Sequence, residues 1–171
     1  MPISLHKATV ASFLQTLPQV VRLVDTAEAH CRDNSGADLC GARLAQDMWP
    51  FAKQVTSVVA HSAGAVRARP GGLFRPALEP APHSFDELRT RLTDAIAFLE
   101  TIDPDAFDQH IGRDMRFEFG ETAMEFWAED FLLSFTVPNF YFHTTSAYAI
   151  LRNQGLPVGK RDFIGRPRLK D

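Results

Sequence analysis

The sequence predicts an all-α fold, a four-helix bundle in up-down-up-down order with one small β-hairpin between the third and fourth helices. Three segments place apolar residues at the i, i+3, i+4, i+7 spacing of a helix with one buried face. A fourth segment is apolar nearly all round, which is typical of a central helix. One short stretch alternates apolar and polar residues with the period of a strand. The 171 residues suit one domain spanning residues 1–171.

The first helix is expected over residues 5–30. The apolar positions of its buried face are Val10, Phe13, Leu14, Leu17, Val21 and Val24. Pro18 lies inside this helix and predicts a kink, because proline removes one backbone hydrogen bond. The polar stretch CRDNSGADLCG then predicts a loop. Cys31 and Cys40 are expected to be free thiols, and two cysteines without a second pair do not form a structural zinc site.

The second helix is expected over residues 43–68, with a restart at Pro50, since proline is favoured in the first turn of a helix. One face carries Phe51, Val55, Val58 and Ser62. His61 falls at the edge of this face, directly above Gln54, because seven residues make about two helical turns. The following stretch, ARPGGLFRPALEPAPH, predicts a long irregular connection, and connections of that length often line a site.

The third helix is expected over residues 84–102. SFDE at its start is a capping box, in which the Ser84 side chain takes a first-turn amide and Glu87 reaches back. The apolar stripe consists of Phe85, Leu88, Leu92, Ile96 and Leu99. DPDAF at 103–107 is expected to end the helix.

A hairpin is expected over residues 114–127. Apolar and charged residues alternate in DMRFEF and again in MEF, with the glycine-containing GETA between them. Alternation places Phe126 inward beside Met124 and Trp127 on the opposite side.

The fourth helix is expected over residues 128–154, ended by Gly155 and Pro157. One stripe on this apolar helix is polar, and it consists of Thr136, Asn139, His143 and Ser146. Their spacings of three, four and three place them on one helical face. A buried polar group needs partners, so this stripe predicts an interior cavity lined by Gln54, Thr136 and Ser146 beside the histidines.

His61 and His143 together suggest a divalent metal, zinc or nickel, since imidazole suits both. A catalytic zinc site has three protein ligands and one open position, and here only the amide of Asn139 offers a third. The alternative interpretation is two satisfied interior histidines. The remaining histidines, His6, His30, His83 and His110, are expected at the surface, and the carboxylates around the hairpin are expected on a solvated face.

Arg67, Arg69 and Arg75 flank the glycines of the long connection. They are candidates to contact an anionic substrate. Alternatively, Arg67 and Arg69 complement the C-terminal end of the second helix. A Gly-rich phosphate loop, a nucleophile elbow and a dinucleotide fingerprint are absent from the sequence.

The net charge and the N-terminal sequence limit the classes of partner that are expected for this protein. A net charge of −3 gives no general attraction to nucleic acid or acidic membranes. The first 21 residues do not resemble a signal peptide, and no apolar run reaches the roughly 18 residues of a membrane span. We therefore expect a cytoplasmic protein without nucleic-acid or membrane partners.

The chain resembles an uncharacterised bacterial family, a domain of unknown function, within the DinB/YfiT-like superfamily of four-helix bundles. The resemblance covers almost the whole chain and rests on AQDMWPFAKQV at 45–55, PNFYFHTTSAYAILRNQG at 138–155 and GKRDFIG at 159–165. The superfamily implies a metal site with one histidine on the second helix and two on the fourth, and some members are thiol-dependent transferases. His61 and His143 match two of these positions, and Asn139 or Ala147 stands where the third histidine would be.

Three functional hypotheses follow. The first is a divalent-metal-dependent enzyme, a thiol-dependent transferase or a hydrolase, with a degenerate site of His61, Asn139 and His143. The second is a non-catalytic module whose cavity binds a small molecule. The third is a structural homodimer that associates through an apolar helix face. The lost histidine favours the second and third.

Overall fold

A computed structural model describes residues 3–34, 37–76, 80, 82 and 84–170, so His83 lies outside the described residues. The first helical segment comprises α1 (Leu5–Ala8) and α2 (Val10–Asp33), and Pro18 lies within α2. Ser4 caps α1 by accepting a hydrogen bond from the backbone N–H of Lys7 at 3.1 Å. The helix expected over residues 5–30 therefore forms and runs three residues further.

The second helical segment begins later than expected. It comprises α3 (Phe51–Val59), the π-helical turn η1 (Ala60–Gly64), α4 (Ala65–Ala68) and the 3₁₀ turn η2 (Arg69–Gly71). Residues 43–49 are not helical, because backbone bonds from Phe51 to Ala42 and from Ala52 to Cys40 fold this loop back onto the start of α3. Pro50 is the N-cap residue, so the helix starts where the sequence indicated a restart.

The third helical segment is α5 (Phe85–Glu100), followed by the short helix α6 (Pro104–Asp108). Ser84 caps α5 through the backbone N–H of Glu87. The carboxylate of Glu87 instead accepts a hydrogen bond from Arg91 at 2.7 Å, one helical turn along, which differs from the reciprocal capping box expected.

A three-stranded sheet combines a short strand that precedes α5 with the hairpin that follows α6. It has the order β1 (Leu73–Phe74), β2 (Asp114–Phe119) and β3 (Thr122–Trp127), with β1 parallel and β3 antiparallel to β2. Phe126 is half-buried and Trp127 is 53% exposed, so the predicted register of the hairpin is confirmed. Strand β1 belongs to the connection that was expected to be irregular.

The fourth helical segment comprises α7 (Ala128–Asp130), the π-helical turn η3 (Phe131–Thr136) and α8 (Val137–Asn153), and α9 (Lys160–Ile164) follows. This segment is not buried all round, in contrast to the sequence expectation. Leu133, Tyr141 and Phe142 are exposed, because neighbouring elements cover only part of its circumference. An apolar sequence alone does not identify a central helix, since folded surfaces also carry apolar atoms.

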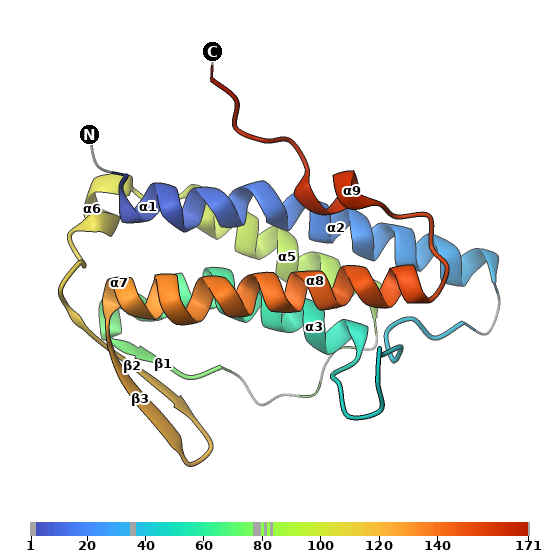
Figure 1. Cartoon of the computed structure of the whole chain (residues 1–171), viewed down its shortest axis with the longest axis horizontal. Coiled ribbons are helices and arrows are strands. Elements are labelled where there is room, and N and C mark those ends of the chain that lie inside the picture. The colour runs from blue at the N-terminus through green and yellow to red at the C-terminus, as the bar shows by residue number, and fades with distance from the viewer. Residues whose placement is uncertain (1–2, 35–36, 77–79, 81, 83, 171) are drawn as a thin grey trace.

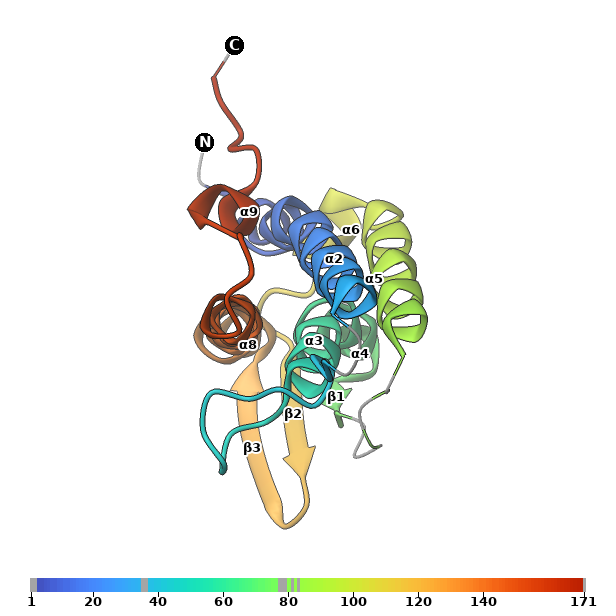
Figure 2. The same ribbon diagram turned by 90° about the vertical axis from the view of Figure 1, so that its right-hand side faces the viewer.

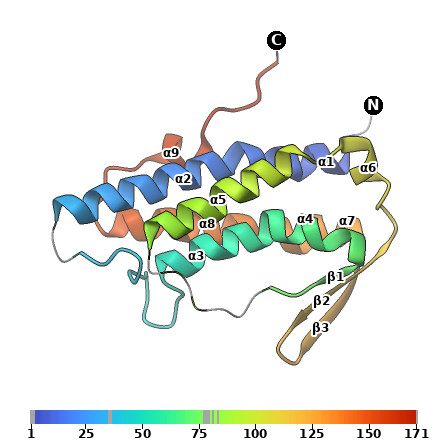
Figure 3. The same cartoon turned by 180° about the vertical axis from the view of Figure 1, so that it is seen from behind.

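The four long helical segments lie side by side in an arrangement that differs from up-down-up-down. Helix α2 packs against α5 and α8, and α3 packs against α8 and α5 (Figure 2). Figures 1 and 3 show α3 and α5 running toward the end of the molecule that carries α6 and the sheet, while α2 and α8 run away from it. The connection between β1 and α5 is long enough to permit this parallel pair. Consequently α3 and α8 are direct neighbours.

The described part of the chain is mostly helical, and none of its helices has both the length and the apolar character needed to cross a membrane. The core consists mainly of aliphatic and phenylalanine side chains, with Phe13, Phe51, Phe107, Phe131 and Phe140 fully buried. Both cysteines are free thiols, and Cys40 is buried, which raises the pKa of its thiol to about 11.

Candidate functional site

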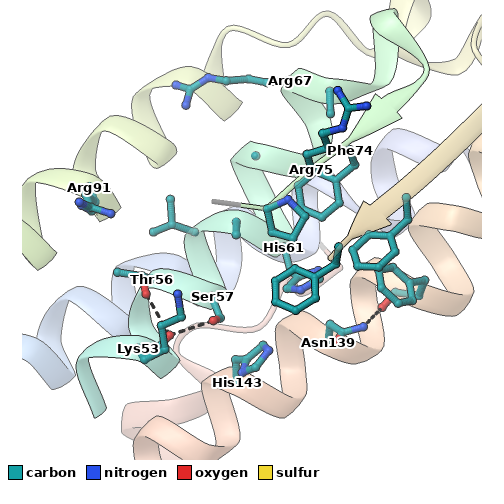
Figure 4. Close-up of a pocket in the computed structure, with 18 of the residues that line it drawn as sticks. Lys53, Thr56, Ser57, His61, Arg67, Phe74, Arg75, Arg91, Asn139 and His143 are labelled. Carbon is teal, nitrogen blue, oxygen red and sulfur yellow. Dashed lines mark hydrogen bonds between the residues drawn. The ribbon is translucent and has the colours of Figure 1, made fainter. Parts of the chain in front are cut away.

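A pocket of about 760 Å³ lies where α3 and η1 face α8 (Figure 4). Strands β1 and β2, the connection after β1 and one residue of α5 complete its wall. Its volume falls in the range of small-molecule sites, roughly 300–1,000 Å³. The pocket therefore has room for an organic ligand rather than for an ion alone.

Two histidines stand together in the wall of this pocket. His61 in η1 and His143 in α8 have ring centroids 5.6 Å apart. Only 8% of His61 and 6% of His143 is exposed. Burial lowers the pKa of His61 to about 3, with a further contribution from His143, and lowers the pKa of His143 to about 4, with a contribution from Lys53. Both imidazoles are neutral at pH 7.

Gln54 determines which nitrogen of His143 carries the proton. Its Nε2 donates to the carbonyl oxygen of Trp49 at 3.1 Å, which leaves Oε1 facing Nδ1 of His143 at 2.7 Å. An amide oxygen only accepts, so Nδ1 of the neutral His143 must be the donor. The remaining nitrogen, Nε2, therefore has a free lone pair that can accept a proton or a hydrogen bond, or bind a cation.

Trp49 covers the other side of this imidazole. Its ring is nearly parallel to that of His143, with 5.5 Å between centroids and 7° between planes. The ammonium group of Lys53, one helical turn along, lies 5.5 Å from the indole centroid. The loop before α3 thus carries an aromatic side chain over the pocket histidine, although Trp49 itself remains 44% exposed.

His61 has apolar neighbours. Its ring meets the rings of Phe74 and Phe135 edge-on, with centroids 5.7 and 5.8 Å away. Its Nδ1 atom is buried and has no hydrogen-bond partner among the residues that the structure describes. An unpartnered buried nitrogen costs folding free energy, and the described protein groups around His61 leave this cost uncompensated.

The wall of the pocket has an apolar part and a basic part. Four phenylalanines form the apolar part, and they are Phe74, Phe117, Phe119 and Phe135. Four cationic side chains also line it, and they are Lys53, Arg67, Arg75 and Arg91. Arg75 is paired with Glu118, and Arg91 with Glu87. None of the lining residues in the described part of the chain is an aspartate or a glutamate.

The structure brings His61, His143 and Asn139 to this one pocket. Nδ2 of Asn139 donates to the carbonyl oxygen of Phe135 at 2.7 Å, so its Oδ1 is left as an acceptor. Gln54, Thr136 and Ser146 were expected in the lining, but they are buried outside it. Gln54 is therefore not part of the pocket wall. It contacts the ring of His143, which does line the pocket, through a hydrogen bond.

The three arginines expected at an anionic ligand lie in different places. Arg75 lines the pocket and is paired with Glu118. Arg67 lines the pocket, and its Cζ atom also lies 4.2 Å from the centroid of the Phe98 ring. Arg69 points elsewhere and is stacked on Phe107 at 3.7 Å, where burial lowers its pKa to about 10. His6, His30 and His110 are half-buried outside the pocket rather than fully exposed.

The sequence reasoning did not identify Trp49, Lys53 and Arg91 as pocket residues. These residues come from a loop and two helices, so no single periodic pattern contains them. One signal was present for Trp49 and Lys53, since Gln54, five and one residues further on, had been identified as a neighbour of His61.

The donor set partly fits a metal. Two neutral imidazoles suit zinc or nickel, and the hydrogen bond from Nδ1 of His143 to Gln54 holds that ring as metal-binding histidines are commonly held. No cluster of three or more histidine, cysteine, aspartate or glutamate side chains that could hold a metal occurs among the described residues. A third donor would have to be the amide oxygen of Asn139 or water, which is weaker than the three-ligand set of catalytic zinc.

The mostly helical fold with its small three-stranded sheet fits that of a DinB family member. The chain is similar to a crystal structure of a DinB family member protein from Shewanella denitrificans, with a TM-score of 0.78 and 27% sequence identity, over 98% of this chain and 95% of that one. Residues 5–164 match the family described as a domain of unknown function, DUF1993. The chain belongs to this family of uncharacterised DinB-like proteins. No curated protein matches it.

Proposed function

We propose that this protein binds a small organic molecule in the pocket between α3 and α8, with the neutral imidazole of His143 as a hydrogen-bond acceptor in the pocket wall. The observation that carries this proposal is the fixed tautomer of His143, held by Gln54 beside a pocket of about 760 Å³. A satisfied structural histidine would use both nitrogens within the protein. Here Gln54 engages only Nδ1.

The apolar part of the pocket supports an organic ligand. Burial of an aromatic or alkyl body against phenylalanine rings contributes roughly 25 cal/mol for each Å² removed from water. The Nε2 atom of His143 gives such a ligand a polar contact. Together these features resemble the usual composition of ligand sites, which are mostly apolar with a few placed polar groups.

A glycine in the pocket provides the test. Gly64 lines the pocket in a helical conformation, and a Cβ atom added there would meet the Phe74 ring at an ordinary 3.6 Å. The substitution Gly64→Met should therefore fold and fill the cavity. We expect saturable binding of 4-phenylbutyrate by the wild type, measured by isothermal titration calorimetry, and an affinity at least tenfold lower in Gly64→Met.

Gly71 offers a matched control, because a Cβ atom added there would meet nothing within 4 Å. Gly71→Met should bind 4-phenylbutyrate as the wild type does. Equal binding by Gly64→Met and the wild type, or no binding by the wild type, would refute the proposal.

A divalent cation held by His61 and His143 is a second candidate function, favoured by the hydrogen bond that leaves Nε2 of His143 unprotonated. Asn139 or water would complete the coordination. A bound cation would act as a Lewis acid toward a ligand in the pocket. With two imidazoles instead of three histidines, the affinity should be lower than at a three-histidine site.

Titration with zinc or nickel tests this candidate. We expect one weak site in the wild type, and loss of that site in both His61→Ala and His143→Ala, because the two imidazoles share it. The variant His110→Ala changes a histidine outside the pocket and should keep the site. Unaltered binding in either pocket variant rules out a shared site, and absence of binding in the wild type removes the candidate.

A further inference from the structure

The charges of the pocket narrow the class of ligand, if the pocket binds one as proposed above. Of the described residues in its wall, four carry a positive charge and none a negative one. The two histidines are neutral, so they do not compensate or add to this charge. The chain as a whole carries a net charge of −3, so the basic wall is a local feature and not a reflection of overall composition.

We infer that the ligand is an amphipathic anion, a molecule with an aromatic or branched alkyl body and a carboxylate or similar acidic end. The apolar body fits against Phe74, Phe117 and Phe135, and the acidic end is drawn to the basic side chains. Glu118 pairs with Arg75 and Arg116 on the exposed side of the sheet. Because Arg75 is paired in this way, we expect the acidic end of the ligand to lie on the side of α3 and α4, near Lys53 and Arg67.

Arg67 is well placed for this role. Its side chain is exposed and lines the pocket. The guanidinium group also contacts the face of the Phe98 ring. A guanidinium stacked on an aromatic ring keeps its in-plane N–H donors available, and these match a carboxylate bidentately. Lys53 approaches from α3 and lies close enough to His143 to lower its pKa.

Three compounds that share a phenylbutyl group and differ in the terminal group show whether the pocket selects a ligand by its charge or by its shape. They are 4-phenylbutyrate, 4-phenyl-1-butanol and 4-phenylbutylamine. We expect the carboxylate to bind about tenfold more tightly than the alcohol, and the amine to bind most weakly. Raising NaCl from 50 to 500 mM should weaken binding of the carboxylate but not of the alcohol, because salt screens only the charged interaction.

Single substitutions show which side chains provide the preference for the carboxylate. Lys53→Met and Arg67→Met should each lower the affinity for the carboxylate three- to tenfold and leave the affinity for the alcohol unchanged. A merely structural role would weaken both compounds, so the alcohol serves as an internal control. Lys160→Met removes an exposed lysine on α9, outside the pocket, and should change neither affinity.

The outcomes distinguish this inference from the proposed function. If none of the three compounds binds the wild type, the pocket is not a ligand site and both fail. If all three bind equally and Gly64→Met abolishes their binding, the pocket is a ligand site but its ligand is not selected by negative charge. If both lysine and arginine variants keep the full preference for the carboxylate, the basic wall does not provide the selectivity.

Discussion

The protein without bound metal is expected to lose stability steeply as the pH falls from about 6.5 toward 4. The folded state lowers the pKa of His61 to about 3 and that of His143 to about 4, from 6.5. Between these limits the unfolded chain binds protons that the folded protein does not, so acid favours unfolding. The stabilisation is complete above pH 6.5 and disappears as the pH falls through the folded pKa values. At pH 5 the loss is about 2 kcal/mol for each histidine.

Urea unfolding at pH 7 and pH 5, with a chelator present, measures this loss. The variant His61→Leu should reduce the loss by about half, because leucine suits a site between Phe74 and Phe135 and does not titrate. Lys53 and the second titrating group, His143, stay in place in this variant. Leu133→Ala keeps both histidines and should show the wild-type pH dependence. The same pH dependence in His61→Leu and the wild type would show that His61 is not held neutral.

Fluorescence can assign the protonation of His143 separately. The chain has two tryptophans, so Trp127→Phe leaves Trp49, stacked on His143, as the only one. A protonated imidazole quenches a neighbouring indole. The emission of this variant should therefore stay constant from pH 8 to pH 5.5 while the protein remains folded.

Phe131→Ala is expected to destabilise the protein by about 3–5 kcal/mol, the usual cost of removing a buried phenylalanine ring. Phe131 is fully buried in η3. Its ring centroid lies 5.5 Å from that of Phe74 and 5.8 Å from those of Phe126 and Phe135. One side chain thus joins strands β1 and β3 to the helix that carries His143, and these contacts are lost together.

Leu133, two residues away in the same turn, provides the matched control because it is 45% exposed. Leu133→Ala should cost less than about 1 kcal/mol, since little of its surface is removed from water. Denaturant midpoints of the two variants give the comparison. Similar losses in both variants would mean that the aromatic cluster does not hold the sheet to the helices.

Sequence reasoning identified the long helices because a helix with one buried face has apolar residues at a regular spacing. This spacing is visible in the sequence itself. Pro50 marks the true start of the second helical segment, whereas residues 43–49 have helix-compatible composition but are bound into a loop by Cys40 and Ala42. The parallel course of α3 and α5 was not predictable from spacing, since a long connection permits either direction. The exposed face of α8 was missed because apolar residues do not reveal how many neighbours a helix has.

The histidine pair was predictable because each member interrupts an apolar pattern on a face that must be buried. Spacing placed Gln54 beneath His61, but its hydrogen bond to His143 crosses 89 residues of sequence and required the packed helices. The basic wall depends on side chains from α3, α4 and α5 meeting at one place, which is a tertiary property. Local propensities carry no information about such a meeting.

The two π-helical turns, η1 and η3, tie the orientation of the site to the length of the chain. In a π turn each backbone N–H bonds to the carbonyl five residues back instead of four, so the helix beyond it presents a different face than a regular α-helix would. Removing Ala60 from η1 would rotate the residues that follow by about 100° relative to α3. His61 would then no longer face α8. The number of residues in this turn therefore decides which side chain stands opposite His143.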